Sequence, residues 1–230
     1  MSKESTVEAL EPDVLAALRR YDTPTMANAI ETFDIRPHDT GYAGHEIRCI
    51  FPDLPVMVGY VATGTIRARG DEPGHGPDLV WNHVRQIPGP RVVVLQDLDD
   101  PPGHGAFWGE VMATTFDALG CEGVVTNGCV RDLDEAHAVG FRFFAGSVGV
   151  SHGYVRAEEV GVPVTVGGLQ VSPGDLLHAD KHGVLLIPRE IAADLPAAAE
   201  RVIAREQNFL GWVKSPEFDP DDNMIGRLRH

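Results

Sequence analysis

Basic residues and cysteines are scarce in this chain. Its 230 residues include 19 Lys and Arg against 34 Asp and Glu, which gives a formal net charge of -15 at pH 7. A surface of this sign repels a phosphate backbone and argues against nucleic-acid binding, although a local Arg can still dominate a small pocket for an anionic substrate. The three cysteines, Cys49, Cys121 and Cys129, are odd in number and show no Cys-x-x-Cys spacing, which indicates a reducing cytosol.

Long hydrophobic runs are absent as well. No apolar run approaches the length of a membrane span, and the opening stretch MSKESTVEAL lacks the basic-then-apolar order of a secretion signal. We therefore expect a soluble, cytoplasmic protein without a membrane partner. Hydrophobic residues make up 43% of the chain, enough for one sizeable core, so we expect a single domain over residues 1–230.

Two common enzyme signatures are missing. Ser151-His152 has no Gly-x-Ser-x-Gly context, which argues against a serine hydrolase. Gly167-Gly168 lacks the strand-to-helix framework of a dinucleotide-binding loop. The chemistry must therefore be sought in other polar clusters.

The stretch His104–Ser147 carries the clearest structural pattern. Met112–Leu119 has helical character and ends at a glycine, and Gly123–Thr126 is a short Val-rich run suited to a strand buried on both faces. Asn127-Gly128 predicts a tight turn, and Arg131-Asp132 follows it at the expected start of a helix. In open α/β folds function collects beyond the carboxyl ends of strands, which is where this polar cluster falls.

Periodic apolar residues predict the other elements. We expect helices over residues 12–18, from 23 onward, over 79–86 and over 191–213, and strands over residues 56–66, 91–96, 141–145, 163–166, 169–171, 175–179 and 184–187. Residues 147–159 are expected to form a loop, and the last short strands a small antiparallel or barrel-like layer. The alternation of strand and helix in the middle of the chain predicts an α/β fold with a mixed sheet.

Arg131 and Asp132 are the first candidate site. A planar guanidinium matches a carboxylate or an enolate oxygen, and the neighbouring carboxylate is a hard ligand for Mg²⁺, which keeps most of its waters. Together they suit an α-keto acid whose carbonyl is polarised by the metal. The alternative is structural, because an Arg-Asp pair at a helix start places an acid where the helix dipole favours it.

The segment Phe107–Met112 is the second candidate. It enters a helix from a loop, so its free backbone N–H groups can bind an anion, and Glu110 is placed to contact a metal-bound water. The alternative is an ordinary helix start preceded by glycine.

A third candidate consists of His178, Asp180 and His182. Their i, i+2, i+4 spacing would place two imidazoles and a carboxylate on one strand face, as in a zinc or iron site. However, Lys181-His182-Gly183 favours a hairpin turn that ends the strand at Asp180. We therefore prefer a turn in which Asp180 bonds its own backbone.

The run from Gly109 to Glu135 resembles the RraA-like family, which includes class II pyruvate aldolases and the regulator of ribonuclease activity. The residues that carry the resemblance are Gly109-Glu110, Gly120 with Gly123-Val124-Val125, Gly128, and Arg131-Asp132-x-x-Glu135. It extends to residues 163–168, 173–176 and 179–188, covers about residues 12–212, and leaves 213–230 as a C-terminal extension. It implies a swivelling-domain-like α/β/β sandwich with mixed sheets, assembled as a homotrimer or hexamer with active sites between subunits.

Carried over position by position, the resemblance implies a substrate site for a 2-oxo acid. Arg131 would bind the substrate carboxylate and steady the enolate. The pyruvyl carboxylate would be held by backbone N–H groups around Gly109, Glu110, Val111 and Met112.

The resemblance also implies a cofactor, Mg²⁺ or Mn²⁺. Asp132 would anchor the metal largely through waters, with Glu110 and Glu135 in or behind the water shell. Glu206, with Glu200 as the second choice, would reach the metal waters from the C-terminal helix of the neighbouring subunit.

The implied activity is that of a metal-dependent carbon–carbon lyase that cleaves 4-hydroxy-2-oxo acids, decarboxylates oxaloacetate, or does both. Each reaction generates a pyruvate enolate, whose negative charge the metal and Arg131 would stabilise. One alternative is a protein-binding regulator like the family's ribonuclease-binding members. Another is a different metal-dependent lyase or hydrolase on the same scaffold.

Two segments depart from the family pattern. One is the extended tail after Trp212, which could reshape the subunit interface. Residues Ser147–Glu159 do not match the Arg/Gly-rich loop of typical aldolases in the family. We therefore expect a different substrate preference. His152 and Tyr154 are candidates for lining a divergent pocket, with ordinary loop residues as the alternative.

Overall fold

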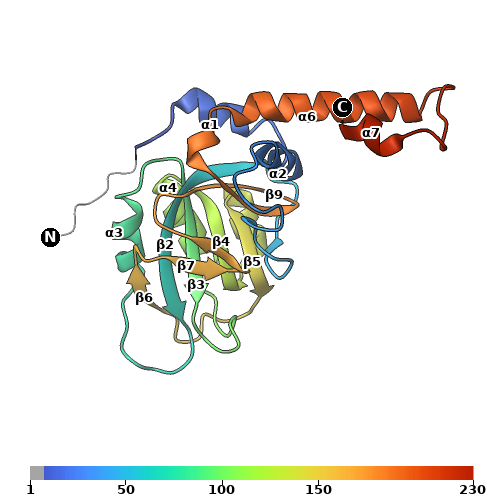
Figure 1. Ribbon diagram of the computed structural model, residues 1–230. Helices are drawn as coiled ribbons and strands as arrows, with labels where there is room; N and C mark the ends of the chain where they lie inside the picture. The colour runs from blue at the N-terminus through green and yellow to red at the C-terminus, as the bar shows by residue number, and fades with distance from the viewer. Residues whose placement is uncertain (1–7, 230) are drawn as a thin grey trace.

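The protein is built from three layers (Figure 1). The structure, a computed structural model, describes residues 8–229. Residues 1–7, part of the opening stretch that lacks a secretion signal, and residue 230 lie outside it. One layer is made of helices, the middle layer is a large mixed sheet, and a small two-stranded sheet covers the other face. The α/β fold with a mixed sheet is thus confirmed, in an α/β/β arrangement.

The helices are α1 (Pro12–Leu18), α2 (Thr23–Glu31), α3 (Asp78–Val84), α4 (Glu110–Ala118), α5 (Leu133–Val139), α6 (Leu195–Val213) and α7 (Met224–Arg229), with a 3-10 turn at Arg189–Ile191. The strands are β1 (Arg48–Cys49), β2 (Met57–Arg67), β3 (Arg91–Asp97), β4 (Cys121–Val130), β5 (Arg142–Val148), β6 (Arg156–Val160), β7 (Val164–Val166), β8 (Leu169–Val171), β9 (Leu176–Asp180) and β10 (Gly183–Ile187). The predicted elements are present, with shifts of a few residues at their ends.

The large sheet has the strand order β1-β5-β4-β3-β2-β9-β10. β2, β3, β4 and β5 run parallel to one another, and α3, α4 and α5 connect them. β2 is long enough to pair with β9 along its first half and with β6 along its second half, both antiparallel. The carboxyl ends of four parallel strands therefore meet at one edge of the sheet.

The large sheet has a hydrophobic core on each of its two faces, and alternating side chains of the central strands contribute to both. On β3, Val93 and Leu95 pack under the helices, whereas Val92 and Val94 face the β7–β8 sheet. Because successive residues of a strand point to opposite faces, a strand covered on both sides reads as a continuous apolar run. That is the pattern from which the buried strands were predicted.

Asn127-Gly128 does not form the predicted turn. β4 continues through both residues to Val130, and the register with β5 shifts between Thr126 and Cys129. The extra residues form a bulge: Gly128 N donates to Thr126 Oγ1 at 3.0 Å, and the Asn127 side chain bonds both backbone groups of Asp97 on β3, at 2.7 and 2.9 Å. Pairing with strands on both sides outweighs the local turn preference.

Two elements occur where none was predicted. The expected loop over residues 147–159 contains the start of β6. The sequence of this strand, RAEEV, is mostly polar, and Ala157 is its one fully buried residue. The C-terminal extension contains α7, which packs back on α6 through Trp212: its ring lies 5.0 Å from the Phe218 ring and 4.5 Å from the Arg227 guanidinium carbon. The last four short strands, which were expected to form one small layer, belong to two different sheets. β7 and β8 form the small sheet, whereas β9 and β10 join the large sheet.

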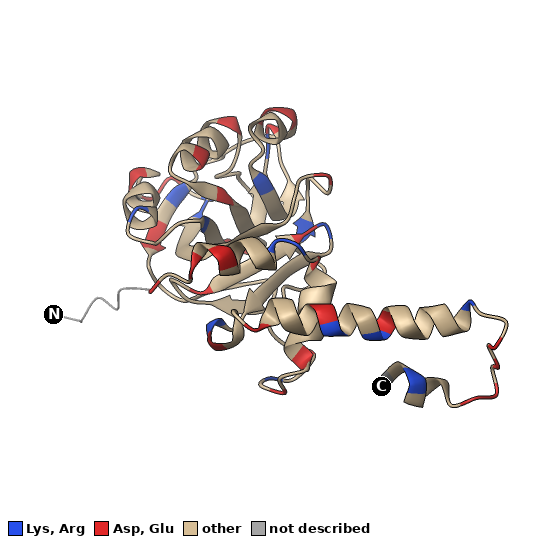
Figure 2. Ribbon diagram, turned by 90° about the horizontal axis from the view of Figure 1, so that it is seen from above, with Lys and Arg blue, Asp and Glu red and all other residues tan. Residues whose placement is uncertain are grey.

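The C-terminal half of α6 extends away from the sheet, as Figures 1 and 2 show. The buried residues of α6 are confined to its first half, ending at Val202. Within residues 8–229, none of the helices combines the length and the apolar character needed to cross a bilayer.

Candidate active site

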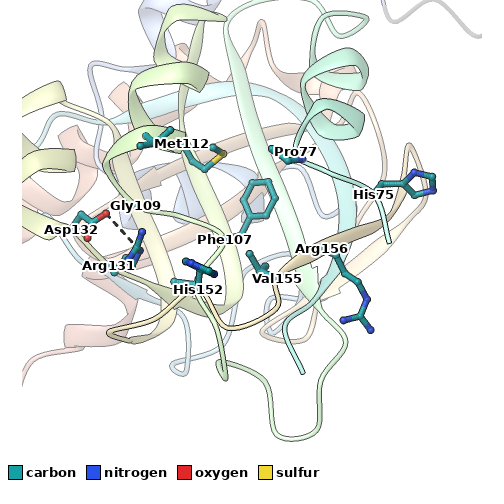
Figure 3. A pocket seen from close by; sticks show the side chains of 12 residues that line it. His75, Pro77, Phe107, Gly109, Met112, Arg131, Asp132, His152, Val155 and Arg156 are labelled. Carbon is teal, nitrogen blue, oxygen red and sulfur yellow. Dashed lines mark ion pairs between the residues drawn. The ribbon is translucent and has the colours of Figure 1, made fainter. Parts of the chain in front are cut away.

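A cavity of about 190 Å³ opens at the edge where the parallel strands end (Figure 3). Its wall comes from the segments that follow β2, β3, β4 and β5, and from the first turn of α4. The lining residues are His75, Pro77, Ala106, Phe107, Gly109, Val111, Met112, Arg131, Asp132, His152, Val155 and Arg156. The site therefore lies beyond the carboxyl ends of the strands, as expected for an α/β sheet.

Asp132 occupies the N-cap position of α5 but does not cap it. Its backbone is left-handed, with φ 52° and ψ 53°, and its side chain makes no bond to its own helix. Instead, Oδ2 accepts the backbone N–H of Glu110 at 3.2 Å and lies 3.6 Å from Nε of Arg131. The side chain therefore does not cap its own helix, and the carboxylate joins the end of β4 to the start of α4.

Gly109 makes room for this carboxylate. Its φ of -160° is an extended conformation that any residue can adopt, so its backbone does not require glycine. A Cβ at this position, however, would collide with Oδ2 of Asp132. The absent side chain is therefore what allows Asp132 to reach the first N–H group of α4.

Trp108 holds the loop after β3 close to the end of β4. It bridges to Val130 in parallel fashion, and Arg131 N donates to Trp108 O at 3.0 Å. The indole is fully buried, 5.7 Å from the ring of Phe141 in a stacked arrangement and 4.7 Å from the ring of Phe116. Aromatic packing thus holds the loop after β3 against the end of β4.

The first turn of α4 presents unpaired N–H groups to the cavity. Glu110 N bonds Asp132, but the N–H groups of Val111 and Met112 have no acceptor among residues 8–229. A helix N-terminus carries a partial positive charge and orphan donors, so it is suited to an anion. The free donors that the predicted anion site requires are therefore available at the start of α4.

A buried acidic pair ties the surrounding loops together. Asp97, the last residue of β3, accepts Gly103 N at 2.7 Å and Asp99 N at 2.9 Å. Asp99 in turn accepts Ala68 N at 2.9 Å, next to the end of β2. Burial raises the pKa of Asp97. These acids position loops and do not line the cavity.

The structure brings together most of the predicted site residues, but not all. Arg131, Asp132, Gly109, Val111 and Met112 line the cavity, with the Arg131 and Asp132 side chains 35% and 33% exposed. Glu110 contributes its backbone, while its side chain is exposed.

The other predicted acids lie outside the cavity wall. Glu135 is exposed on the first turn of α5. Glu206 lies on α6, where its Oε1 accepts from Nδ2 of Asn28 at 3.4 Å, and Glu200 accepts from the Tyr21 hydroxyl at 3.2 Å. No group of three or more His, Cys, Asp and Glu side chains within residues 8–229 is arranged to hold a metal.

The sequence did not single out the residues that form the opposite wall. His75 and Pro77 belong to the loop after β2, and Val155 and Arg156 stand at the start of β6. The order of strands along the chain does indicate where these residues lie, because each of these segments follows a parallel strand and therefore begins at the same edge of the sheet. His152 was named as a candidate and lines the cavity, whereas Tyr154 is 66% exposed and does not.

The third candidate, the set His178, Asp180 and His182, lies at a hairpin turn, as the sequence favoured. Asp180 Oδ1 accepts His182 N at 2.8 Å across the β9–β10 turn. His178 is buried, with Nδ1 3.0 Å from Oγ1 of Thr23 and Nε2 3.2 Å from the carbonyl oxygen of Leu18. The two imidazoles therefore have structural partners.

The chain is similar in sequence to proteins that carry a name. One curated relative, from Halalkalibacterium halodurans, bears the name "Putative 4-hydroxy-4-methyl-2-oxoglutarate aldolase". It is 31% identical over 117 residues, or 50% of this chain, and the match spans about half of the relative's length, at 49%.

Two solved structures share the fold. A Pseudomonas syringae pv. tomato protein aligns with a TM-score of 0.73 at 21% identity, covering 99% of this chain and 98% of that one. Streptomyces coelicolor RraAS2, named as an unusual member of the RNase ES inhibitor RraA protein family, aligns with a TM-score of 0.69 at 20% identity, covering 87% and 96%. The family model named RraA-like, Aldolase/RraA, matches residues 23–186, which is more than half of the chain. The protein therefore belongs to the RraA-like family.

Proposed function

We propose that the cavity binds a 2-oxo acid and stabilises a pyruvate enolate, so that the protein acts as a divalent-metal-dependent carbon–carbon lyase. The observation that carries this proposal is the meeting of Arg131, Asp132 and the free N–H groups at the start of α4 in one cavity. A guanidinium and unpaired backbone donors suit a carboxylate next to an oxygen that gains negative charge. The name of the Halalkalibacterium halodurans relative supports the same class.

The chain's own groups have definable roles in aldol cleavage. The C3–C4 bond of a 4-hydroxy-2-oxo acid breaks, its electron pair stays on C3 as the enolate, and the 4-hydroxyl proton passes to a water molecule as C4 becomes a carbonyl. The N–H groups of Val111 and Met112 hold the substrate carboxylate, and Arg131 stabilises the enolate oxygen. A proton then adds to C3 and pyruvate leaves. In oxaloacetate the corresponding bond breaks, and carbon dioxide is the other product.

Asp132 fits a divalent cation that is held through one protein oxygen. Oδ2 is engaged by Glu110 N and Arg131, whereas Oδ1 has no hydrogen-bond partner among residues 8–229. A single carboxylate suits Mg²⁺ or Mn²⁺, which keep several waters, and Glu110 and Glu135 can support that water shell from the first turns of α4 and α5. A bound cation would polarise the 2-oxo group as a Lewis acid.

A second copy of the chain would complete the site in a homotrimer or hexamer. Glu206 lies on α6 beyond the last buried residue, Val202, in the part of the helix that extends away from the sheet (Figure 1). It does not line the cavity of its own chain. A neighbouring copy could therefore bring this acid to the waters around the cation.

A non-catalytic regulator that binds another protein is the second candidate. Exposed apolar side chains on the C-terminal helices favour it: Leu210, Ile225 and Leu228 are 48%, 66% and 43% exposed. This function would leave the free N–H groups and the Arg131–Asp132 pair without a role.

Deuterium exchange into pyruvate tests the enolate chemistry directly. The wild-type protein is incubated with pyruvate in D₂O with Mg²⁺, Mn²⁺ or EDTA, and loss of the methyl proton signal is followed by NMR against a protein-free control. Pyruvate release from oxaloacetate and from 4-hydroxy-4-methyl-2-oxoglutarate is measured in parallel. We expect exchange that depends on the metal.

Two variants sharpen this experiment. Arg131→Ala should lower the exchange rate by about 10²–10³-fold, as loss of an oxyanion donor does. The matched control is Arg85→Ala, at an exposed position after α3, which should exchange at the wild-type rate. If wild-type protein with either metal catalyses neither exchange nor pyruvate release, the lyase assignment is wrong and the regulator becomes the better candidate.

A further inference from the structure

The cavity has a polar end and an apolar end. Arg131 and Asp132 stand at one end with the N–H groups of α4. Phe107, Pro77 and Val155 form the wall beyond them (Figure 3). A substrate whose carboxylate and 2-oxo group occupy the polar end must direct its remaining carbons toward the apolar wall.

Arg156 lines the cavity, but its charge is engaged elsewhere. Nε donates to Glu158 at 3.0 Å, Nη2 to Glu72 at 3.1 Å, and Nη1 to the carbonyl oxygens of Arg69 and Gly70 at 2.9 and 3.3 Å. The side chain is only 10% exposed. Two carboxylates neutralise the guanidinium, and each of its three nitrogens already donates a hydrogen bond, so it has little capacity left for a substrate anion.

The direction of Arg156 agrees with this pairing. Figure 3 shows its guanidinium pointing away from Phe107 and Val155. The head group instead faces a second, open hollow of about 500 Å³, which is also lined by Arg67, Asp99 and Glu158. The cavity therefore meets only the apolar stem of Arg156.

His75 is turned outward as well. Its backbone N and O both pair with Ala157 of β6, at 2.9 Å each, which fixes the loop after β2 against β6. Figure 3 shows the imidazole ring directed away from Phe107 and Pro77.

His152 also lines the cavity, beside Arg131 and Val155 (Figure 3). Its Nδ1 lies 2.7 Å from the carbonyl oxygen of Gly153, while Nε2 has no partner among residues 8–229. Phe107, Pro77 and Val155 themselves offer neither a cation nor a side-chain donor.

We propose that the cavity selects 2-oxo acids whose second end is uncharged and apolar, such as 4-hydroxy-2-oxo acids with an alkyl tail, over dicarboxylates. The inference rests on the proposed function and narrows its substrate class. A carboxylate placed against Phe107, Pro77 and Val155 would lose its water without gaining a partner, which is costly, whereas an alkyl tail gains from leaving water. This specificity differs from the dicarboxylate in the name of the Halalkalibacterium halodurans relative.

The test uses two substrates that differ only at the far end. The aldol adduct of pyruvate with butanal, 4-hydroxy-2-oxoheptanoate, ends in a methyl group, and the adduct with succinic semialdehyde, 4-hydroxy-2-oxoheptanedioate, ends in a carboxylate. Pyruvate release from each is measured with the metal-loaded wild-type protein. We expect kcat/KM for the alkyl substrate to be higher by about tenfold or more, because Phe107, Pro77 and Val155 offer the second carboxylate no partner.

Two variants test the cause of the preference. Val155→Lys places a cation at the apolar wall and should shift the kcat/KM ratio toward the dicarboxylate by about tenfold. Arg156→Gln should leave the ratio within about twofold of wild type, because the guanidinium does not meet the substrate.

The outcomes separate the two proposals. Deuterium exchange into pyruvate depends only on the polar end of the cavity. If the protein catalyses this exchange but prefers the dicarboxylate substrate, the apolar specificity alone is overturned. The same conclusion follows if Arg156→Gln loses only the reaction with the dicarboxylate. A protein that neither exchanges nor releases pyruvate overturns the proposed function and this inference with it. The wild-type ratio decides the matter even if a variant fails to fold.

Discussion

Asp132 and Glu110 are joined across the cavity rim, where Oδ2 of the Asp132 carboxylate accepts the Glu110 backbone N–H at 3.2 Å. The acid that follows β4 therefore holds the first turn of α4 in place. Its second oxygen, Oδ1, stays available for a ligand. One side chain thus connects the placement of the N–H groups of α4 to the proposed binding of a cation.

Replacing Asp132 should separate these two roles. Asp132→Ala should abolish metal-dependent pyruvate release with little effect on folding, because the lost hydrogen bond lies in a part-exposed site and is worth about 1 kcal/mol. Asp132→Asn keeps an oxygen that accepts from Glu110 N but removes the charge, so it should fold like wild type and bind Mn²⁺ at least about tenfold more weakly.

Calorimetric titration with Mn²⁺ and thermal unfolding check this prediction. Asp134→Ala is the matched control, since that acid is exposed on the first turn of the same helix. Unchanged metal-dependent turnover in Asp132→Ala would show that the metal is held elsewhere.

Gly109→Ala should damage the site without unfolding the protein. The added Cβ would collide with Oδ2 of Asp132, while the extended backbone at this position tolerates alanine. The carboxylate must move away from Glu110 N, so we expect a loss of kcat/KM of about tenfold or more, as for other small displacements of catalytic groups.

The control for this substitution is Gly211→Ala on α6, where an added Cβ meets no atom within 4 Å. It should stabilise the helix by about 0.5–1 kcal/mol and leave activity unchanged. Equal activity of Gly109→Ala and wild type would mean that the Asp132–Glu110 contact is not needed for turnover.

Mixing two inactive variants tests whether sites lie between copies. If Glu206 of one subunit completes the water shell at Asp132 of another, Asp132→Ala and Glu206→Ala are each inactive, but their mixed oligomers contain some sites with both acids. Unfolding and refolding the two variants together should therefore restore part of the wild-type pyruvate release, with each variant refolded alone as the control. Full activity of Glu206→Ala by itself would contradict the role given to this acid.

Stability should fall as the pH drops from 7 to 5, because of two buried histidines. Burial lowers the pKa of both His83 and His178. In the unfolded chain each takes up a proton near the ordinary pKa of about 6.5, whereas in the folded protein each takes it up only at a lower pH. The unfolded state then binds more protons, so the free energy of unfolding decreases by up to about 1.4 kcal/mol per pH unit for each histidine.

Urea unfolding at several pH values measures this slope. His178→Gln and His83→Gln should each flatten it, whatever their effect on stability at pH 7. His45→Gln is the control, because the His45 side chain is 94% exposed. A slope that is unchanged in both buried-site variants would show that these groups titrate alike in the folded and unfolded chains.

The polar end of the site could be predicted from the sequence because it is built from short contiguous segments. Arg131-Asp132 and Phe107–Met112 each carry a recognisable chemistry, and both follow parallel strands whose ends must meet. The bulge at Asn127-Gly128 could not be predicted, since the local residues favour a turn and only the pairing of β4 with strands on both sides decides otherwise.

The apolar end could not be predicted because it depends on long-range register. Val155 stands just before β6, a polar strand that lacks the apolar alternation of a half-buried strand and pairs with the second half of β2. Pro77 is brought opposite by the pairing of His75 with Ala157. Neither relationship leaves a local mark in the sequence.

The two ends of the cavity come from different parts of the chain. The polar end is carried by β4 and α4, and the apolar wall largely by the loop after β2 and the approach to β6. In the proposed lyase, substitutions at Pro77 or Val155 would therefore change the choice of substrate while the groups around Arg131 keep their places. A library randomised at these two positions should yield catalysts for a range of aldehyde acceptors that all share one nucleophile.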